Sequence, residues 1–211
     1  MRGRFRLPRV YPITDTQISG LSHAEQVALF AEGGATVVQL REKHAPAREF
    51  YEQAKAALKV ANNRGVRLIV NDRADIALAI GAAGVHLGQD DLPPEAARRL
   101  LGEDAIIGYS THSLAQIQEA AKLPIDYFAI GPIFSTSTKE NPDPVVGLDG
   151  ARLAREAIGD RLLVGIGGIS QTNAAEVIHA GTDAVALIRA LLSDSTRIPQ
   201  TLQALITRLR P

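Results

Sequence analysis

Tyr127-Phe128-Ala129-Ile130 is a short apolar run, and the hydroxyl-rich stretch Gly131-Pro132-Ile133-Phe134-Ser135-Thr136-Ser137-Thr138-Lys139 follows it directly. The apolar run, bounded by turn residues, predicts a buried strand. If the following segment is extended, the hydroxyls of Thr136 and Thr138 point the same way, because side chains alternate along a strand. With the ammonium group of Lys139 they form a candidate phosphate-binding group. Taken alone, the stretch is more typical of an exposed Ser/Thr loop between two elements.

The same unit, an apolar strand followed by a polar loop and a helix, recurs along the chain. The expected strands are residues 9–14, 36–40, 67–70, 84–87, 105–108, 127–130, 162–164 and 183–188. Helices are expected over residues 22–32, 47–63, 73–80, 151–158 and 171–180, and from residues 93, 113 and 199 onward. Ser22 and Glu25 have the spacing of a capping box, as do Ser113 and Gln116.

These units predict a single (β/α)₈ TIM barrel domain over residues 1–211. Each helix is long enough to cross between parallel strands, and the strands are apolar on both faces, as a buried parallel sheet requires. Eight units fit a closed barrel at the small end of that fold. A doubly wound open sheet is the alternative, but its glycine fingerprint does not follow the first strand, and Gly165-Ile166-Gly167-Gly168 comes too late to serve.

The composition of the chain limits the kinds of molecule that it can bind and the chemistry that it can perform. The chain has 23 Lys and Arg, 23 Asp and Glu, and no cysteine. Balanced charge provides no overall field for nucleic acid or an acidic membrane, and the absence of cysteine excludes disulfides, zinc–thiolate sites and thiol nucleophiles. No apolar stretch has the length of a membrane span or of a signal-peptide core. We expect a soluble, cytoplasmic protein with neither nucleic acid nor membrane as a partner.

Polar residues collect where the expected strands end, which is where barrel enzymes have their active sites. In chain order they are Gln39, Arg41, Glu42 and Lys43; Asn71 and Asp72; Gln89, Asp90 and Asp91; Ser110, Thr111 and His112; Thr136, Thr138 and Lys139; Gly165, Gly167 and Gly168; and Ile188 and Arg189. Carboxylates on neighbouring strands, beside bound phosphates, suit Mg²⁺. Backbone N–H groups near the late glycines suit a second phosphate.

Each part of this set has a structural alternative. Arg41-Glu42-Lys43 could be a solvated charge cluster, and the glycine run could be only a tight turn. Asn71-Asp72 and Asp90-Asp91 could simply cap the helices that follow them. His86 alternates with apolar neighbours and is interpreted as a packed core histidine. A nucleophile pair of Ser110 and His112 is not favoured, since no orienting acid is evident.

Several motifs together resemble the thiamine phosphate synthase family, in order from about Tyr11 to Leu191. They are Gln39-Leu40-Arg41-Glu42-Lys43, Asn71-Asp72, His86-Leu87-Gly88-Gln89-Asp90-Asp91, Gly131-Pro132-Ile133-Phe134 with Thr136, Thr138 and Lys139, and Gly165-Ile166-Gly167-Gly168-Ile169. The resemblance implies an enzyme that joins a pyrimidine diphosphate to a thiazole phosphate, with release of diphosphate.

The resemblance also implies roles for individual residues. The pyrimidine diphosphate would be held by Gln39, Leu40, Arg41, Glu42 and Lys43 with Asn71, Ser110 and Lys139, and one Mg²⁺ per subunit by Asp72 and Asp91. The thiazole phosphate would be held by Thr136, Ser137, Thr138, Gly168, Ile188 and Arg189. Arg41, Lys43 and Lys139 would be the catalytic residues. The family often has small hydroxyl residues after the eighth strand, whereas this chain has Ala186 and Arg189. Backbone contacts at Ile188-Arg189 remain compatible with that change, and the direction of the Arg189 side chain stays open.

Three other functions are compatible with a barrel of this kind. A thiazole tautomerase of the same pathway would have a histidine in place of Pro132 and would need no pair of metal ligands. A non-catalytic thiamine-phosphate-binding protein would use the same pocket. An unrelated sugar-phosphate isomerase would need an acid–base pair over a carbon acid. The sequence leaves a homo-oligomer open.

Overall fold

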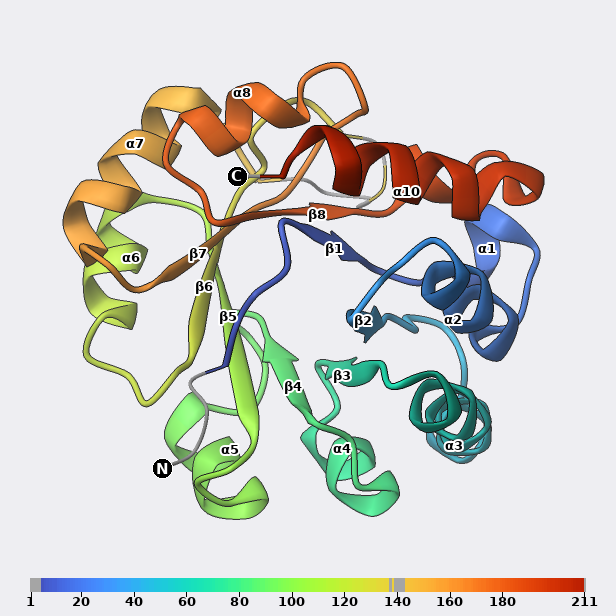
Figure 1. Ribbon diagram of the computed structural model, residues 1–211. Coiled ribbons are helices and arrows are strands. Elements are labelled where there is room, and N and C mark those ends of the chain that lie inside the picture. The colour runs from blue at the N-terminus through green and yellow to red at the C-terminus, as the bar shows by residue number, and fades with distance from the viewer. Residues whose placement is uncertain (1–4, 137, 139–142, 211) are drawn as a thin grey trace.

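Eight parallel strands form one sheet in the computed structural model, which describes residues 5–136, 138 and 143–210 (Figure 1). They are β1 (Val10–Pro12), β2 (Val37–Leu40), β3 (Arg67–Asn71), β4 (Gly84–Leu87), β5 (Ile106–Thr111), β6 (Tyr127–Ile130), β7 (Leu162–Gly165) and β8 (Ala184–Leu187). Hydrogen-bonded neighbours run β1-β8-β7-β6-β5-β4-β3-β2. A parallel bridge from Ile13 to Gln39 joins the two ends of this order, with Thr14 N donating to Gln39 O at 2.9 Å. The predicted (β/α)₈ barrel is confirmed.

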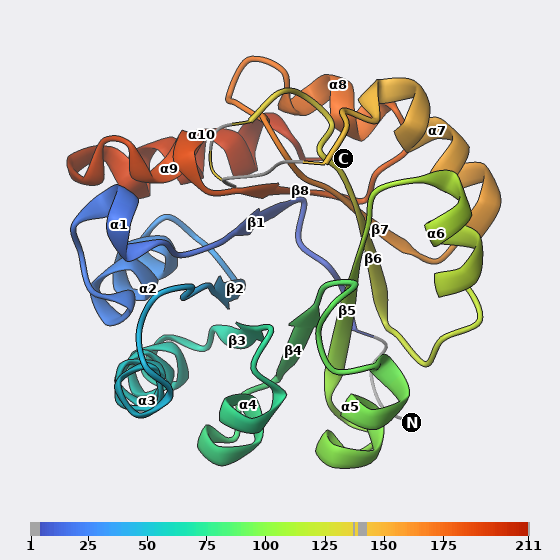
Figure 2. The same cartoon turned by 180° about the vertical axis from the view of Figure 1, so that it is seen from behind.

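Helices surround the strands in both face-on views (Figures 1 and 2). They are α1 (Thr16–Ser19), α2 (His23–Glu32), α3 (Ala47–Arg64), α4 (Ala74–Ile80), α5 (Pro94–Leu101), α6 (Leu114–Ala120), α7 (Gly147–Ile158), α8 (Ala174–His179), α9 (Arg189–Leu192) and α10 (Ile198–Arg208), with a 3₁₀ turn at Ser195–Arg197. The sequence pattern did not predict α1, α9 or the 3₁₀ turn, because four residues or fewer carry no helical periodicity.

The two capping-box predictions had different outcomes. At α2 the box is complete, since Ser22 and Glu25 each bond the other's backbone N–H. At α6 only half of it forms. Ser113 accepts from Gln116 N at 3.2 Å, but the Gln116 side chain accepts from His112 N at 2.6 Å. That bond attaches the loop after β5 to the start of α6.

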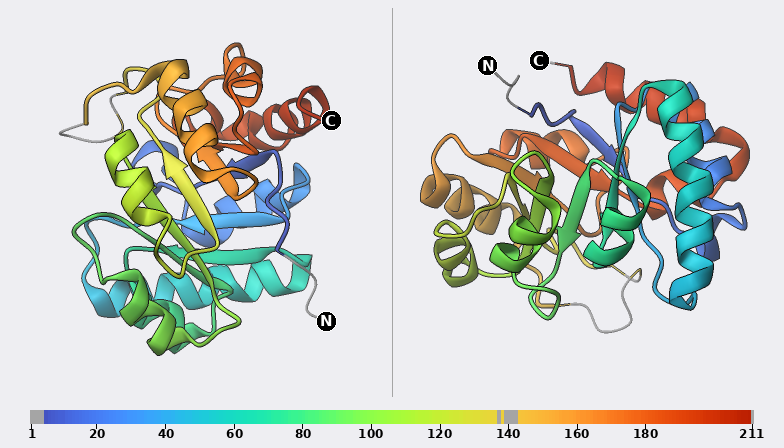
Figure 3. Two further views of the ribbon diagram at one scale, coloured as in Figure 1. Left: turned by 90° about the vertical axis from the view of Figure 1, so that its left-hand side faces the viewer. Right: turned by 90° about the horizontal axis from the view of Figure 1, so that it is seen from below.

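Alternation along the strands divides the core into two parts. One part lies between the strands and the helices, and the other fills the barrel. The interior part consists of Tyr11, Ile13, Val37, Ile69, Ile106, Tyr127, Ala129, Val164, Ala184 and Ala186. Phe5 and Leu7 pack against it from the segment before β1, with the Phe5 and Tyr127 ring centroids 6.3 Å apart. That segment lies at the same end of the barrel as the last turn of α10 (Figure 3).

Within the described part of the chain, no helix combines the length and apolar character that a bilayer crossing requires.

Candidate active site

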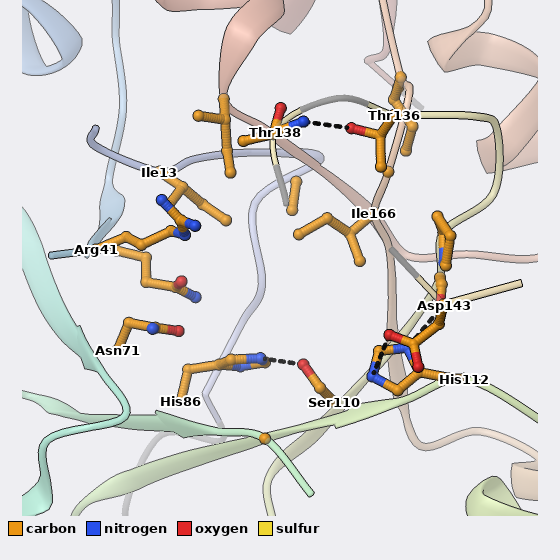
Figure 4. A pocket seen from close by; sticks show the side chains of 18 of the residues that line it. Ile13, Arg41, Asn71, His86, Ser110, His112, Thr136, Thr138, Asp143 and Ile166 are labelled. Atoms are coloured by element: carbon orange, nitrogen blue, oxygen red, sulfur yellow. Dashed lines mark hydrogen bonds and ion pairs between the residues drawn. The ribbon is translucent and has the colours of Figure 1, made fainter. Parts of the chain in front are cut away.

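A cavity of about 740 Å³ lies at the C-terminal ends of the strands. Its floor is the last layer of inward-facing side chains, and its walls are the loops that follow the strands (Figure 4). The floor consists of Ile13, Gln39, Asn71, His86, Ser110, Ile166 and Ala186. Catalytic sites of barrel enzymes occupy this position because the loops here vary without disturbing the packed interior.

The structure brings most of the predicted site residues together around this cavity. Those that line it are Gln39, Arg41, Lys43, Asn71, Asp72, Asp91, Ser110, Thr136, Thr138, Gly168, Ile188 and Arg189. Ser137 and Lys139 lie outside the described residues. Leu40 and Glu42 are not among the residues that line the cavity.

Leu40 and Glu42 face away for a simple geometric reason. Gln39 points into the barrel, so Leu40 beside it points outward and is fully buried against the helices. The Glu42 carboxylate accepts from the backbone N–H groups of His44 at 2.8 Å and Ala45 at 3.1 Å. Burial by itself would raise the pKa of Glu42, but these bonds and the nearby His23 hold it below its ordinary value. Glu42 therefore shapes the loop that carries its two basic neighbours.

Those two neighbours, Arg41 and Lys43, direct positive charge to the cavity. Arg41 Nη1 donates to Asp15 Oδ2 at 2.6 Å, and its backbone N donates to Thr14 Oγ1 at 3.2 Å. Lys43 Nζ forms an ion pair with Asp72 Oδ2. Figure 4 places Arg41 between Ile13 and Asn71, on the cavity side of β2. The interpretation of this segment as only a solvated charge cluster does not fit the ordered contacts of Arg41.

Asp72 and Asp91 converge, as expected for residues that follow neighbouring strands. Asp91 Oδ2 accepts from Gly88 N at 2.7 Å, and Asp72 adopts a left-handed backbone with φ of 64°. Burial raises the pKa of Asp91, and the charge of Asp72 beside it raises that pKa further. Neither carboxylate caps a helix, because α4 and α5 begin without a side-chain capping bond. Two adjacent hard-oxygen donors therefore face the cavity.

The loops after β6 and β7 pack tightly against each other. Phe134 N donates to Gly167 O at 3.0 Å, and a Cβ on Gly168 would lie 2.5 Å from Ser135 O. Gly168 has φ of 63°, which favours glycine. The glycine run thus does more than make a turn, since it admits the hydroxyl-rich loop to the cavity wall.

Thr136 and Thr138 lie beyond the end of β6, so neither belongs to a strand. β6 ends at Ile130, and Thr138 N donates to Thr136 Oγ1 at 3.3 Å. Both threonines line the cavity (Figure 4).

His86 is buried, with 7% of its surface exposed, as predicted, but it also lines the cavity floor. Its Nδ1 lies 2.9 Å from Tyr127 Oη and its Nε2 lies 2.8 Å from Ser110 Oγ. Burial lowers the pKa of His86 to about 4, so the ring is neutral at pH 7. Ser110 is therefore paired with His86 rather than with His112, and His86 is a weak base.

Sequence reasoning missed Asp143, Tyr11 and Tyr127, and it assigned no role to His112. His112 lies with its Nε2 3.5 Å from Asp143 Oδ2, and both line the cavity (Figure 4). Asp143 lies between β6 and α7, far from His112 in the sequence, so no local pattern indicated that the two would meet. Tyr11 and Tyr127 bond to each other inside the barrel. The available signal was a tyrosine hydroxyl in each of two otherwise apolar strands, in the middle of β1 and at the start of β6.

The depressed pKa of His86 predicts how acid affects stability. An unfolded histidine titrates near 6.5, whereas the folded pKa is about 4. Between these two pKa values the unfolded chain binds a proton that the folded chain does not. The free energy of unfolding therefore decreases as the pH falls from about 6.5 to about 4, by about 3 kcal/mol in total. Denaturant unfolding at pH 7 and pH 4.5 should show a smaller acid loss for His86→Gln than for the wild type. The exposed His179→Gln variant should behave like the wild type. An equal acid loss in all three proteins would contradict the prediction.

A barrel whose strand ends present basic groups, paired carboxylates and hydroxyl-rich loops around one cavity defines a class: a (β/α)₈ protein suited to phosphorylated small molecules. The family model described as thiamine monophosphate synthase matches residues 10–191. The chain belongs to this family.

Individual relatives agree with that assignment. A thiamine-phosphate synthase of Koribacter versatilis is 47% identical over 203 residues, covering 92% of this chain and 93% of the relative. One from Chloroflexus aurantiacus is 44% identical over 202 residues, covering 94% and 93%. The solved thiamine phosphate pyrophosphorylase of Pyrococcus furiosus superposes with a TM-score of 0.85 at 34% identity, covering 96% of this chain and 97% of that one.

Proposed function

We propose that this chain is a transferase that joins 4-amino-2-methyl-5-(diphosphooxymethyl)pyrimidine to 4-methyl-5-(2-phosphooxyethyl)thiazole, giving thiamine phosphate and diphosphate. Membership of the family supports this proposal. The observation that carries it is the convergence of Asp72 and Asp91 with Arg41 and Lys43 in one cavity. Departure of a diphosphate requires neutralisation of its growing negative charge by basic side chains and a carboxylate-bound metal, and does not require an acid–base pair.

The proposed reaction is a dissociative substitution. The bond between the pyrimidine methylene carbon and the diphosphate oxygen breaks, and its electron pair leaves on that oxygen. The electron-rich aminopyrimidine stabilises the methylene cation, and the lone pair of the thiazole nitrogen then forms the C–N bond. Arg41 and Lys43 lie where they can neutralise charge on the diphosphate, and Gln39, Asn71 and Ser110 lie where they can orient the ring.

Asp72 and Asp91 are the residues that would hold Mg²⁺. Among the described residues, no group of three or more potential ligands forms a complete metal site. Two carboxylates are nevertheless what Mg²⁺ uses when substrate phosphates and water complete its shell. Burial raises the pKa of Asp91, and the neighbouring Asp72 carboxylate raises it further, so a cation held between the two would relieve their repulsion. When bound, Mg²⁺ would neutralise charge on the diphosphate.

The thiazole phosphate is assigned to the opposite rim of the cavity, formed by Thr136, Thr138, Gly168, Ile188 and Arg189. Ser137 is kept in this group on the strength of the sequence motif. Arg189 is exposed at the start of α9 and lines the cavity, so its charge can add to backbone contacts there.

A protein nucleophile is not required in this scheme. The nearest candidate, Ser110, bonds to a histidine with a pKa of about 4, which is too weak a base to activate a hydroxyl near pH 7. The reaction therefore depends on positioning and charge.

The decisive experiment measures diphosphate release with each substrate alone, with both together, and with a chelator. Release only when both substrates and Mg²⁺ are present supports the proposal. Thiazole isomerisation that survives the chelator would show a tautomerase instead, and tight binding of thiamine phosphate without turnover would show a binding protein.

Replacing Lys139 by alanine should lower turnover strongly, by about 100-fold or more, because its ammonium is assigned to the departing diphosphate. Steady-state rates of the two proteins test this, with Lys122→Ala, an exposed lysine on another loop, as the control. A Lys139→Ala enzyme as fast as the wild type would remove Lys139 from the catalytic set.

Two further expectations stay proposals. A cytoplasmic location fits substrates that carry phosphate groups, since such anions do not cross membranes unaided. A homo-oligomer remains a prediction.

A further inference from the structure

A chain of hydrogen bonds crosses the inside of the barrel and connects two residues of the cavity floor. Gln39 Nε2 donates to Tyr11 Oη at 3.4 Å, and Tyr11 Oη lies 3.1 Å from Tyr127 Oη. Tyr127 Oη lies 2.9 Å from His86 Nδ1, and His86 Nε2 lies 2.8 Å from Ser110 Oγ. We call these five side chains the relay. Its three middle members have not been given a role so far.

A glycine on β5 leaves the space that the relay occupies inside the barrel. Strand register places Gly108 of β5 directly between His86 and Tyr127. A Cβ on Gly108 would lie 2.1 Å from Tyr127 Cζ and 2.5 Å from His86 Nδ1. The missing side chain lets the two rings stack, with centroids 5.5 Å apart and planes 26° apart. Phe5 covers Tyr127 from the other end of the barrel.

The donor and acceptor in each hydrogen bond of the relay follow from the groups that are present. The Gln39 amide nitrogen can only donate, so Tyr11 Oη accepts from it. Among the described residues Tyr11 Oη has one other partner, Tyr127 Oη, and its hydroxyl is buried, so Tyr11 must donate to Tyr127 or leave a buried donor unsatisfied. Tyr127 then donates to His86 Nδ1, and His86 donates from Nε2 to Ser110.

Protonation agrees with this direction. Burial raises the pKa of Tyr11 to about 12 and that of Tyr127 well above 10, so both hydroxyls keep their protons at pH 7. Since His86 Nδ1 accepts from Tyr127, that nitrogen carries no proton, and the ring proton is on Nε2, which faces Ser110 Oγ.

We propose that Tyr11, Tyr127 and His86 are positioning residues that make Gln39 present an amide oxygen, and Ser110 a hydroxyl proton, to the pyrimidine ring. This inference rests on the proposed function. An acceptor at one end and a donor at the other match a 4-aminopyrimidine, whose amino group donates and whose ring nitrogen accepts. The 4-oxo analogue has the reverse pattern, with an oxygen that accepts and a ring N–H that donates. The relay thus selects the amino form.

Two variants test the relay through kinetics. Tyr11→Phe and Tyr127→Phe keep both rings and remove one hydroxyl each. Each should lower kcat/KM for the pyrimidine diphosphate about tenfold, with KM for the thiazole phosphate changed less than twofold, and should reduce the preference for the 4-amino over the 4-oxo diphosphate. Tyr51→Phe, on the outer helix α3, is the matched control and should behave as the wild type. Wild-type kcat/KM and preference in both relay variants would overturn the proposal.

A second readout needs no substrate. Nitrogen-15 NMR of the histidine rings should show His86 protonated at Nε2 in the wild type and in Tyr11→Phe, but partly at Nδ1 in Tyr127→Phe, which loses the donor to that atom. An Nδ1–H tautomer in the wild type would overturn the proposed direction. If the wild type formed no thiamine phosphate, the proposed function would be wrong. The position of the His86 ring proton would then be the test of the proposed hydrogen-bond direction. If Tyr127→Phe did not fold, Tyr11→Phe would still supply the kinetic result.

Discussion

Replacement of Asp91 by asparagine is expected to lower the rate of diphosphate release about a thousandfold at Mg²⁺ concentrations that saturate the wild type. The carboxylate is one of two hard-oxygen donors proposed for the metal, and an amide oxygen is a much poorer ligand. The fold should tolerate the change, because the asparagine oxygen can still accept from Gly88 N. Loss of the repulsion from Asp72 should leave the metal-free protein at least as stable as the wild type.

Rates of diphosphate release across a Mg²⁺ titration measure the loss of the metal ligand. Thermal unfolding without metal measures the effect on stability. Asp75→Asn is the matched control, since that carboxylate is exposed on α4 and pairs with Arg73. Asp91→Asn with an unchanged rate and unchanged half-saturation by Mg²⁺ would remove Asp91 from the proposed metal site.

Replacement of Arg41 by methionine should lower kcat/KM for the pyrimidine diphosphate about 100- to 1000-fold. The guanidinium is pre-oriented at little entropic cost, because Asp15 Oδ2 holds one nitrogen and Asp15 Oδ1 is itself fixed by the N–H groups of Gln17 and Ile18. Its remaining N–H groups can bind phosphate oxygens in pairs, which a lysine cannot do.

Two companion variants sharpen this test. Asp15→Asn keeps the cation but weakens its orientation, so we expect a smaller loss, about tenfold and mainly in KM. Arg152→Met, on the exposed face of α7, is the control. A rate for Arg41→Met within threefold of the wild type would mean that Lys43 and the metal suffice for the departing diphosphate.

Much of the architecture could be predicted because barrel strands follow local rules. Each buried parallel strand is a mostly apolar run of three to six residues, and capping residues such as Ser22 indicate helix starts. Boundaries were less accurate where the local signal was weak. Helix α7 begins at Gly147 rather than near Ala151, and α8 begins at Ala174 rather than near Gln171.

The cavity residues were predictable to a similar degree, because every strand end contributes to one rim once a barrel is assumed. What failed was the direction of individual side chains. Leu40 and Glu42 belong to the same motif as Gln39 and Arg41, yet alternation and loop hydrogen bonds turn them away. Asp143 reaches His112 across a loop, and no spacing rule connects the two.

The repeated strand–helix units, the (β/α)₈ class and the family could all be predicted from the order of the residues, since they depend on hydrophobic periodicity and on motifs that are contiguous in the chain. Which polar groups meet depends on how the folded chain brings distant strands together. Tyr11, His86 and Tyr127 are separated by 41 to 116 residues and touch because strand register aligns them and Gly108 leaves room. Hydrogen bonds and charge coupling act over a few ångströms, so they depend on closure of the barrel rather than on distance along the chain.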